Sequence, residues 1–328
     1  MGRGRVWIEL SRVHTAGLTT ALLVGGYLIA GGSVFSIHFL LWFLCGVLYH
    51  VCGFIHNNIT DVAYDSVDPS KKHFPLVSGL INFRKADEID RYLMILFCFY
   101  ASYLTMLQPI PTFFLILAIS GGLLYDYYSK VTPLAVPGVA TAWGILPIIS
   151  YYSTTSNFSP VIIYLVAYTW MQVFIQISVL GFLKDLEAPR ENNFLRILGS
   201  HVDSGVLLMS FGAILYMIVT KVVHMFLLIP VLVSSASTVP AAILSGGLYS
   251  LSWVIYAKTI NPINLRWDRG KVLGRIVLHE ALCFLAAMPA IQGVVGWNAV
   301  FLLLIYPPIW VFVWMRLQWG SWRLGPKV

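Results

Sequence analysis

Charged residues are scarce in this sequence of 328 residues. Asp, Glu, Lys and Arg make up 11% of it, whereas hydrophobic residues make up 58%. A soluble domain of this length does not need so apolar a surface, so the composition excludes a soluble globular protein. Repeated apolar runs of about 18 or more residues are each long enough to cross a bilayer. The sequence therefore predicts an all-α, polytopic transmembrane helical bundle.

Cysteine is also scarce, and its positions exclude two kinds of site. The four cysteines, Cys45, Cys52, Cys98 and Cys283, are scattered through apolar stretches. They show neither the spacing of a metal site nor pairing in loops, so we interpret them as small core residues. A cleavable signal peptide is not expected, because the apolar stretch after Arg12 is too long and more such stretches follow at once.

Ten apolar stretches are predicted to span the membrane, with the N-terminus inside. They are residues 13–35, 36–56, 91–108, 110–128, 137–153, 160–183, 204–221, 232–257, 273–294 and 297–315. All but one of the 21 Lys and Arg residues then fall in or at the edge of an inner segment, and Lys221 is the exception. This bias follows the positive-inside rule, so the basic excess indicates anionic lipid headgroups rather than nucleic acid. We expect an integral membrane protein with both termini and the acidic loops on the cytoplasmic side.

Most acidic residues fall in two inner segments, 57–91 and 184–203, which are four spans apart. This spacing suggests two pseudo-repeated four-helix units around a central cavity open to the inner face. Two more spans follow, and a count of about nine to ten is expected. No low-complexity segment or long linker interrupts residues 1–328, so a single domain is predicted.

Residues 81–91 connect the first acidic segment to the next predicted span. They mix apolar and charged residues at helical spacing, and Asp87 is placed to pair with Arg91. The pattern predicts an amphipathic cap helix at the inner face, although an ordinary interfacial connector has the same pattern.

The sequence NNITDVAYD at residues 57–65 places amides and carboxylates on one face of a helix. Asn57, Asp61 and Asp65 recur every four residues, so their side chains form a stripe that drifts by only about 40° per step. Stacked carboxylates repel one another unless a cation lies between them, and acids near a membrane are usually functional. The stripe therefore indicates a site for a divalent metal ion that carries a diphosphate.

The longer segment 57–79, NNITDVAYDSVDPSKKHFPLVSG, resembles the first signature of the UbiA superfamily of intramembrane prenyltransferases. That signature is NDxxDxxxD followed by a basic segment that ends in Pro-Leu-x-Ser-Gly. Asn58 replaces an Asp of the signature, and Phe74 replaces the usual Arg before Pro-Leu. The resemblance covers most of the chain. It implies an enzyme that uses Mg²⁺ to ionise an isoprenyl diphosphate and transfers the prenyl group to an acceptor.

The chemistry of these residue types agrees with that implication. Mg²⁺ prefers oxygen ligands and is commonly held by one or two carboxylates together with phosphate oxygens. Asp61 and Asp65 are the predicted catalytic ligands, with Asn57 as a neutral ligand or donor. The diphosphate is predicted to be neutralised by Lys71, Lys72 and His73. Aromatic faces stabilise an allylic cation, and the candidates are Tyr125, Tyr127, Tyr128, Trp143, Tyr151 and Tyr152.

Other residues resemble family features more loosely. Arg12 stands beside the first span, and Tyr128-Ser129-Lys130 follows the fourth. We assign Lys130 to catalysis. The remaining assignments to substrate binding are Arg12, Asn58, Tyr128, Lys184 and Arg190.

The second acidic segment departs from the family pattern. In the family it carries two Asp residues four apart that bind a second Mg²⁺. Asp185 takes the first position here, but Pro189 stands at the second. Glu187 and Glu191 offer an alternative pair, although Pro189 disturbs a helix there. The second ion is predicted to be held by Asp185 with a glutamate, or to be held weakly.

Three functions stay open at this stage. A prenyltransferase that acts on a small-molecule or lipid acceptor is the leading hypothesis. A terpene cyclase of the same superfamily would ionise the diphosphate without an acceptor. A cation-coupled transporter is more remote. Transporters place carboxylates near the midplane, whereas here nearly every acid lies at the inner edge and only Glu280 falls well inside a predicted span.

Overall fold

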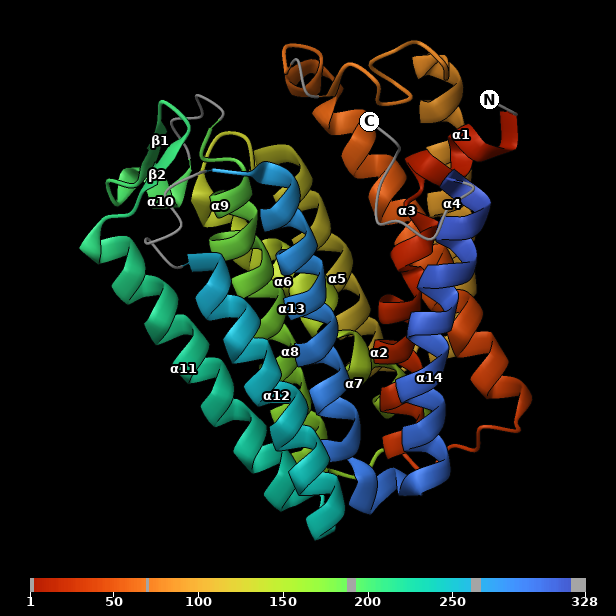
Figure 1. Cartoon of the computed structure of the whole chain (residues 1–328). Helices are drawn as coiled ribbons and strands as arrows, with labels where there is room; N and C mark the ends of the chain where they lie inside the picture. The colour runs from red at the N-terminus through yellow and green to blue at the C-terminus, as the bar shows by residue number, and fades with distance from the viewer. Residues whose placement is uncertain (1–2, 69–70, 188–192, 261–266, 320–328) are drawn as a thin grey trace. The chain divides into compact units, whose positions relative to one another are not determined.

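The computed structural model describes residues 3–68, 71–187, 193–260 and 267–319 (Figure 1). Almost all of the regular structure there is helical, and one short β hairpin is the exception. Eight helices in the described ranges are long and apolar enough to cross a membrane, and a shorter apolar helix covers Val13–Ile29. The predicted all-α, polytopic membrane fold is confirmed.

The chain folds into two compact units, and each unit is built from segments that are separate in the sequence. The first unit contains the residues up to 127, residues 146–158 and the residues from 301 onward. The second unit contains residues 128–145 and 159–300. The prediction of a single domain stays a prediction.

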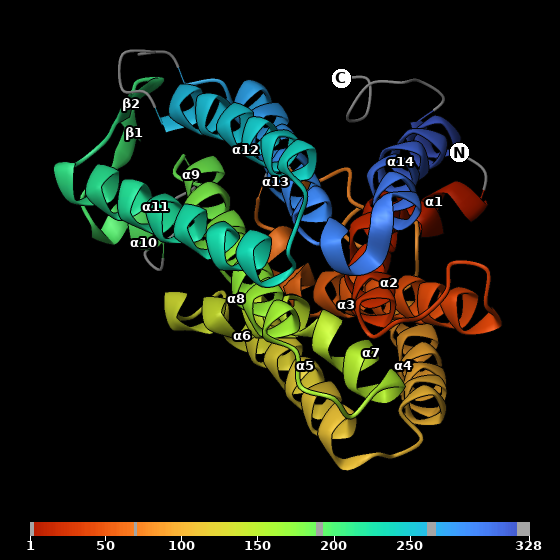
Figure 2. The same ribbon diagram turned by 90° about the horizontal axis from the view of Figure 1, so that it is seen from below.

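The first unit is a group of helices packed around α2. Its elements are α1 (Arg3–Leu10), η1 (Val13–Thr15), α2 (Ala16–Ile29), α3 (Ile37–Asp65), α4 (Phe83–Thr105), α5 (Pro109–Tyr128), α7 (Leu146–Thr154) and most of α14 (Gln292–Trp319). Helix α2 packs against α3 and α7, and α3 packs against α4 (Figure 2). Gly46 permits the contact between α2 and α3, since a Cβ there would lie 2.7 Å from Thr20 Cα. Small residues commonly allow such close helix crossings in membranes.

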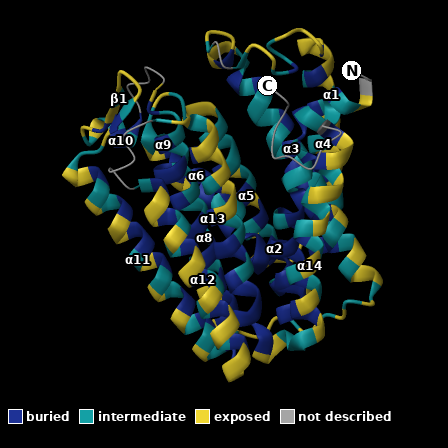
Figure 3. Ribbon diagram, in the orientation of Figure 1, coloured by how far each residue is buried: buried dark blue, intermediate teal, exposed yellow. Residues whose placement is uncertain are grey.

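The second unit holds the remaining elements. They are η3 (Pro133–Ala135), α6 (Val136–Gly144), α8 (Pro160–Ile175), η4 (Gln176–Gly181), α9 (Phe182–Lys184), α10 (Phe194–Ile197), β1 (His201–Asp203), β2 (Val206–Leu208), α11 (Phe211–Ser234), α12 (Val239–Ile260) and α13 (Arg269–Ala290). Helices α6 and α11 pack against α8, and α12 packs against α13. Figure 3 shows exposed residues recurring along α11 and α12, as expected for helices with one face toward lipid. Strand β1 pairs antiparallel with β2 in a hairpin that sequence analysis did not predict.

Several helices begin at residues whose side chains satisfy the first backbone N–H groups. Ser36 accepts from Phe39 N at 3.1 Å and starts α3, and Asn82 accepts from Lys85 N at 3.3 Å and starts α4. Asp268 does the same for α13. A capping side chain of this kind contributes roughly 1 kcal/mol to helix stability. These caps fix the N-terminal ends of α3, α4 and α13.

Each of the ten predicted spans corresponds to a helical segment in the described ranges, but the boundaries differ. The seventh predicted span, 204–221, is too early, because α11 runs from Phe211 to Ser234. Lys221, predicted at the outer end of that span, therefore lies inside α11 and is fully buried. Residues 235–238 separate α11 from α12, so these are two distinct helices.

The first acidic segment is more helical than predicted. Residues 57–65 form the last turns of α3, so the loop proper is confined to the stretch between α3 and α4. The expected cap helix over 81–91 is not a separate element, because α4 begins at Phe83 and continues without a break to Thr105. Arg91 pairs with Asp87 at 2.7 Å, as predicted.

Candidate active site

The C-terminal turns of α3 carry the acidic stripe. Asp61 and Asp65 are 7% and 4% exposed, and Asn57 is half-buried one turn earlier. Two carboxylates this well buried repel each other and lose hydration, so they require nearby positive charge. The structure shows which cations supply it.

Lys71 and Arg12 are two cations that interact with the stripe. Lys71 Nζ forms an ion pair with Asp65 Oδ1 at 2.5 Å. Burial lowers the pKa of the Arg12 guanidinium, and the adjacent carboxylates of Asp61 and Asp65 oppose that shift. Arginine keeps its charge because its ordinary pKa is so high. The site therefore combines two acidic and two basic side chains, which suits the binding of a metal ion together with a multiply charged anion.

The two basic residues that follow Lys71 in the sequence are exposed rather than paired with the stripe. Lys72 and His73 are both exposed, and the imidazole of His73 contacts the ring of Phe74. Of the three residues predicted to neutralise a diphosphate, only Lys71 is thus drawn into contact with a stripe carboxylate.

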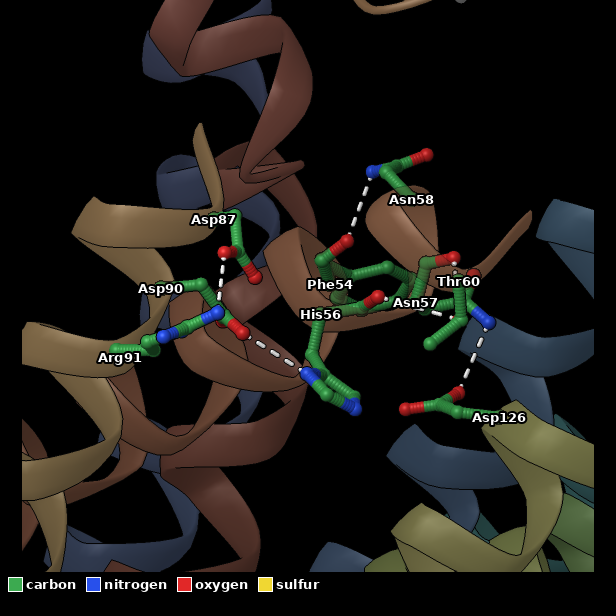
Figure 4. Close-up of polar contacts among 9 residues, drawn as sticks. All are labelled: Phe54, His56, Asn57, Asn58, Thr60, Asp87, Asp90, Arg91 and Asp126. Atoms are coloured by element: carbon green, nitrogen blue, oxygen red, sulfur yellow. Dashed lines mark hydrogen bonds and ion pairs between the residues drawn. The ribbon is translucent and has the colours of Figure 1, made fainter. Parts of the chain in front are cut away.

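The two amides at the start of the motif have different partners (Figure 4). Asn57 Nδ2 donates to Asp126 Oδ1 on α5 at 2.9 Å. Asn58 Nδ2 donates to two carbonyl oxygens, those of Leu10 at 2.7 Å and Phe54 at 2.8 Å. An Asp at position 58 has no donor for these carbonyls when ionised. This geometry explains why Asn fits at position 58.

The imidazole of His56 contacts α4. Its Nδ1 lies 2.8 Å from Asp90 Oδ2, and Asp90 is buried (Figure 4). The pair ties α3 to α4 at the level of the motif.

The second acidic segment follows a change in helix geometry. Helix α8 passes through the π-helical turn η4 into the short α9, which ends at Lys184 and has Asp185 as its C-cap. Turns of this kind are frequent at functional sites. Asp185 Oδ1 pairs with Arg269 Nη2 at 3.3 Å. Asp185, the predicted ligand of the second metal ion, is therefore paired with a cationic side chain, as Asp65 is.

Lys184 and Glu187 are the other predicted residues of this segment that the structure describes. Glu187 is exposed and accepts from Trp267 Nε1 at 3.1 Å. Lys184 interacts electrostatically with Glu280, whose Oε2 accepts from Gln176 at 2.9 Å. Arg190 and Glu191 lie outside the described residues.

Tyr128 is the last residue of α5, and Lys130 lies two residues after it. Tyr128 is an exposed side chain at the last position of the helix, and Lys130 is half-buried in the turn after it. Both belong to the second unit, whereas Asp61 and Asp65 belong to the first.

Sequence reasoning missed two partners of the predicted site residues. Asp126 could have been found, because it is an acid at the end of an apolar span. Arg269 gave no such signal, since it fell among basic residues already explained by the positive-inside rule.

The donor set fits Mg²⁺ only with help from a ligand. Within the described ranges, no three His, Cys, Asp or Glu side chains gather closely enough to form a metal site of their own. Mg²⁺ is usually bound by one or two carboxylates and completed by waters and substrate phosphates. Asp61 and Asp65 meet that requirement with Asn57 beside them.

Comparison with known proteins identifies the fold. The solved UbiA homologue from Aeropyrum pernix K1 has a TM-score of 0.61 at 15% identity, covering 85% of this chain and 96% of that one. A UbiA homologue from Archaeoglobus fulgidus, solved with GPP and Mg²⁺, has a TM-score of 0.60 at 16% identity, covering 88% and 99%. A digeranylgeranylglyceryl phosphate synthase has a TM-score of 0.54 at 17% identity, covering 90% and 100%. At these identities the likeness shows the fold.

The sequence itself supplies the family. No curated protein matches the chain. Residues 18–266, which include both acidic segments, match the UbiA prenyltransferase family. The chain belongs to that family.

Proposed function

We propose that this protein is an Mg²⁺-dependent intramembrane prenyltransferase that ionises an isoprenyl diphosphate and transfers the prenyl group to an acceptor. The observation that carries the proposal is the buried pair Asp61 and Asp65 on one face of α3, with Lys71 and Arg12 beside it. Family membership supports the reaction type. The Archaeoglobus fulgidus homologue, solved with GPP and Mg²⁺ and also with DMAPP and Mg²⁺, supports the substrate class.

The proposed roles follow from charge. Asp61 and Asp65 hold Mg²⁺, and Asn57 adds a neutral oxygen, while the Asn57 amide nitrogen is held by Asp126. Mg²⁺ bound there would supply the positive charge that neutralises the leaving diphosphate. Arg12 and Lys71 bind the departing diphosphate through charge-assisted hydrogen bonds. For Lys71 this requires that it leave Asp65, which then becomes available as a ligand.

The second unit is proposed to serve the same reaction. Asp185 is the proposed principal ligand of a second Mg²⁺, supported by Glu187 or Glu191, with Lys184 and Arg190 as diphosphate contacts. Lys72, His73, Asn58, Tyr128 and Lys130 are proposed to assist substrate binding or transfer. We further propose that the acidic segments face the cytoplasm, because the Lys and Arg residues concentrate in the same inner segments.

The test is diphosphate release by the purified protein with allylic diphosphates of increasing chain length, with and without Mg²⁺. Mass spectrometry identifies the organic product. We expect Mg²⁺-dependent release that Asp61→Asn abolishes, while Asp203→Asn, the same change on the exposed hairpin, leaves it intact. Normal turnover by Asp61→Asn in folded protein would contradict the assignment.

The product distinguishes the two reactions of the family. A prenylated acceptor supports the transferase. A cyclised hydrocarbon or alcohol formed without an acceptor would instead identify a terpene cyclase. Failure of the wild-type protein to bind any of these diphosphates would contradict both.

A further inference from the structure

Arg12 adopts a backbone conformation that arginine rarely uses. It lies between α1 and η1 with φ 46° and ψ 32°, in the left-handed region. Outside glycine this region is unfavourable, and residues held there tend to occur where a side chain must be aimed. The surrounding contacts explain how the conformation is held.

The backbone of Arg12 is fixed by His50 of α3. His50 Nε2 lies 3.0 Å from the Arg12 carbonyl oxygen, which also accepts from the Thr15 hydroxyl at 3.0 Å. A carbonyl only accepts, so His50 Nε2 carries a proton and donates. On the other side of the ring, Nδ1 lies 2.8 Å from the Thr19 hydroxyl. His50 is 1% exposed, so both of these contacts are made by a buried ring.

The guanidinium of Arg12 is held by the next two turns of the same helix. Its central carbon lies 4.9 Å from the centre of the Phe54 ring, a cation–π distance. Nη2 donates to Asn58 Oδ1 at 3.4 Å. The amide of Asn58 cannot flip without losing its two bonds to the Leu10 and Phe54 carbonyls, so its oxygen is kept facing Arg12.

His50, Phe54 and Asn58 recur every four residues and form a second stripe on α3. On an ideal helix Asn58, the last of the three, lies three residues before Asp61 and is rotated from it by only about 60°. The last turns of one helix therefore carry the acidic stripe and, beside it, residues that contact Arg12. The hydrogen bond to Asn58, one residue after Asn57, brings the guanidinium beside the acidic stripe, and Arg12 interacts electrostatically with Asp61 and Asp65.

We infer that His50, Phe54 and Asn58 are positioning residues that hold Arg12 in place to bind the diphosphate of the substrate. This inference rests on the proposed function. Arginine pays a large entropy cost when it is immobilised by an anion, and a guanidinium that is already fixed avoids that cost. The three residues act through Arg12 and need not touch the substrate themselves.

Binding of inorganic pyrophosphate with Mg²⁺ to the full-length protein in detergent, measured by calorimetry, tests the inference without turnover. We expect Asn58→Ala and Phe54→Leu each to raise the dissociation constant by about tenfold, which corresponds to one lost charge-assisted interaction. His38→Gln, on an exposed residue of the same helix, is the control for His50→Gln. If His50→Gln fails to fold, the other two variants carry the test.

A double-mutant comparison separates positioning from general damage. In an Arg12→Gln background the same substitutions should change pyrophosphate binding by less than about twofold, since residues that act through a common partner are not additive. Full additivity, or unchanged binding in the single variants, overturns the inference while leaving the proposed function intact. Absence of pyrophosphate binding by the wild-type protein overturns both.

Discussion

Lys71 Nζ lies 2.5 Å from Asp65 Oδ1, so the more buried carboxylate of the acidic stripe already has a cationic partner. Both groups are largely withdrawn from solvent, and a buried charge left without a partner is costly. A metal ion that binds Asp65 must therefore compete with Lys71 for the carboxylate. In the proposed reaction the lysine would exchange Asp65 for the diphosphate.

Replacing Lys71 should separate metal binding from substrate binding. In Lys71→Met the half-saturating Mg²⁺ concentration should fall, because Asp65 no longer has a competing cation. The KM for the prenyl diphosphate should rise by about tenfold, because one charge-assisted hydrogen bond is lost. Lys72→Met is the matched control, since Lys72 is the exposed neighbour. Diphosphate release measured against Mg²⁺ and against substrate gives both values, and parallel changes would contradict the exchange.

Asp126 should affect the affinity of the site for Mg²⁺, because it orients the side chain of Asn57. Its carboxylate accepts from the Asn57 amide nitrogen at 2.9 Å, which leaves the amide oxygen for a cation. Substitution of residues that orient metal ligands typically weakens binding by about 10- to 100-fold, so Asp126→Ala should raise the half-saturating Mg²⁺ concentration by at least tenfold. Asp126→Asn keeps an acceptor oxygen and should change it less.

The control for Asp126 is Asp87→Ala on α4. Asp87 pairs with the exposed Arg91, and such surface pairs contribute little. Mg²⁺ titrations of the three variants test the prediction, and equal behaviour of Asp126→Ala and Asp87→Ala would show that Asn57 does not depend on Asp126.

The part of the site that could be predicted from the sequence is the part set by local periodicity. Asn57, Asp61 and Asp65 lie on one face because a helix repeats every 3.6 residues, whatever surrounds it. The Asp87–Arg91 pair follows from the same rule. The helical spans were predictable because bilayer thickness dictates the length of an apolar run.

Partners that are distant in sequence could not be predicted in this way. Asp126 meets Asn57 across 69 residues, and Arg269 meets Asp185 across 84 residues. The left-handed Arg12 has no sequence signal, since its conformation depends on His50 and Thr15. These relationships arise from tertiary packing, which overrides local preference.

Asp185 should matter more than the neighbouring glutamate. It is the first acid after α9 and pairs with Arg269, whereas Glu187 is exposed and bonded to Trp267. If Asp185 is the principal ligand of a second ion, Asp185→Ala should lower kcat for diphosphate release at least tenfold more than Glu187→Ala, since a ligand carboxylate contributes several kcal/mol of charge stabilisation. Glu191→Ala completes the series. A larger loss in either glutamate variant would move the site along the segment.

Lys221 provides a prediction about stability, independent of the active site. It is fully buried in α11, and its ammonium donates to Ser252 Oγ at 3.0 Å, His279 Nε2 at 2.9 Å and Cys283 Sγ at 3.0 Å. The ring of Tyr249 lies 4.3 Å from the same nitrogen. Since an ammonium has three N–H donors, these three acceptors satisfy it and tie α11 to α12 and α13.

Removing this side chain should destabilise the second unit according to what replaces it. Lys221→Ala leaves a cavity and three buried groups without their donor, so we expect a loss of about 3 kcal/mol or more. Lys221→Met fills most of the volume and removes the cost of a buried charge, so its loss should be smaller. Lys258→Ala on the exposed end of α12 is the control. In detergent, the thermal midpoint of the Lys221→Ala protein should lie below that of the Lys221→Met protein, and both should lie below that of the wild type.

Below these midpoints both Lys221 variants should keep Mg²⁺-dependent diphosphate release, because the cluster is expected to stabilise the fold rather than take part in the reaction. Loss of release in a folded, thermally stable Lys221→Met protein would instead assign this buried lysine a part in the chemistry.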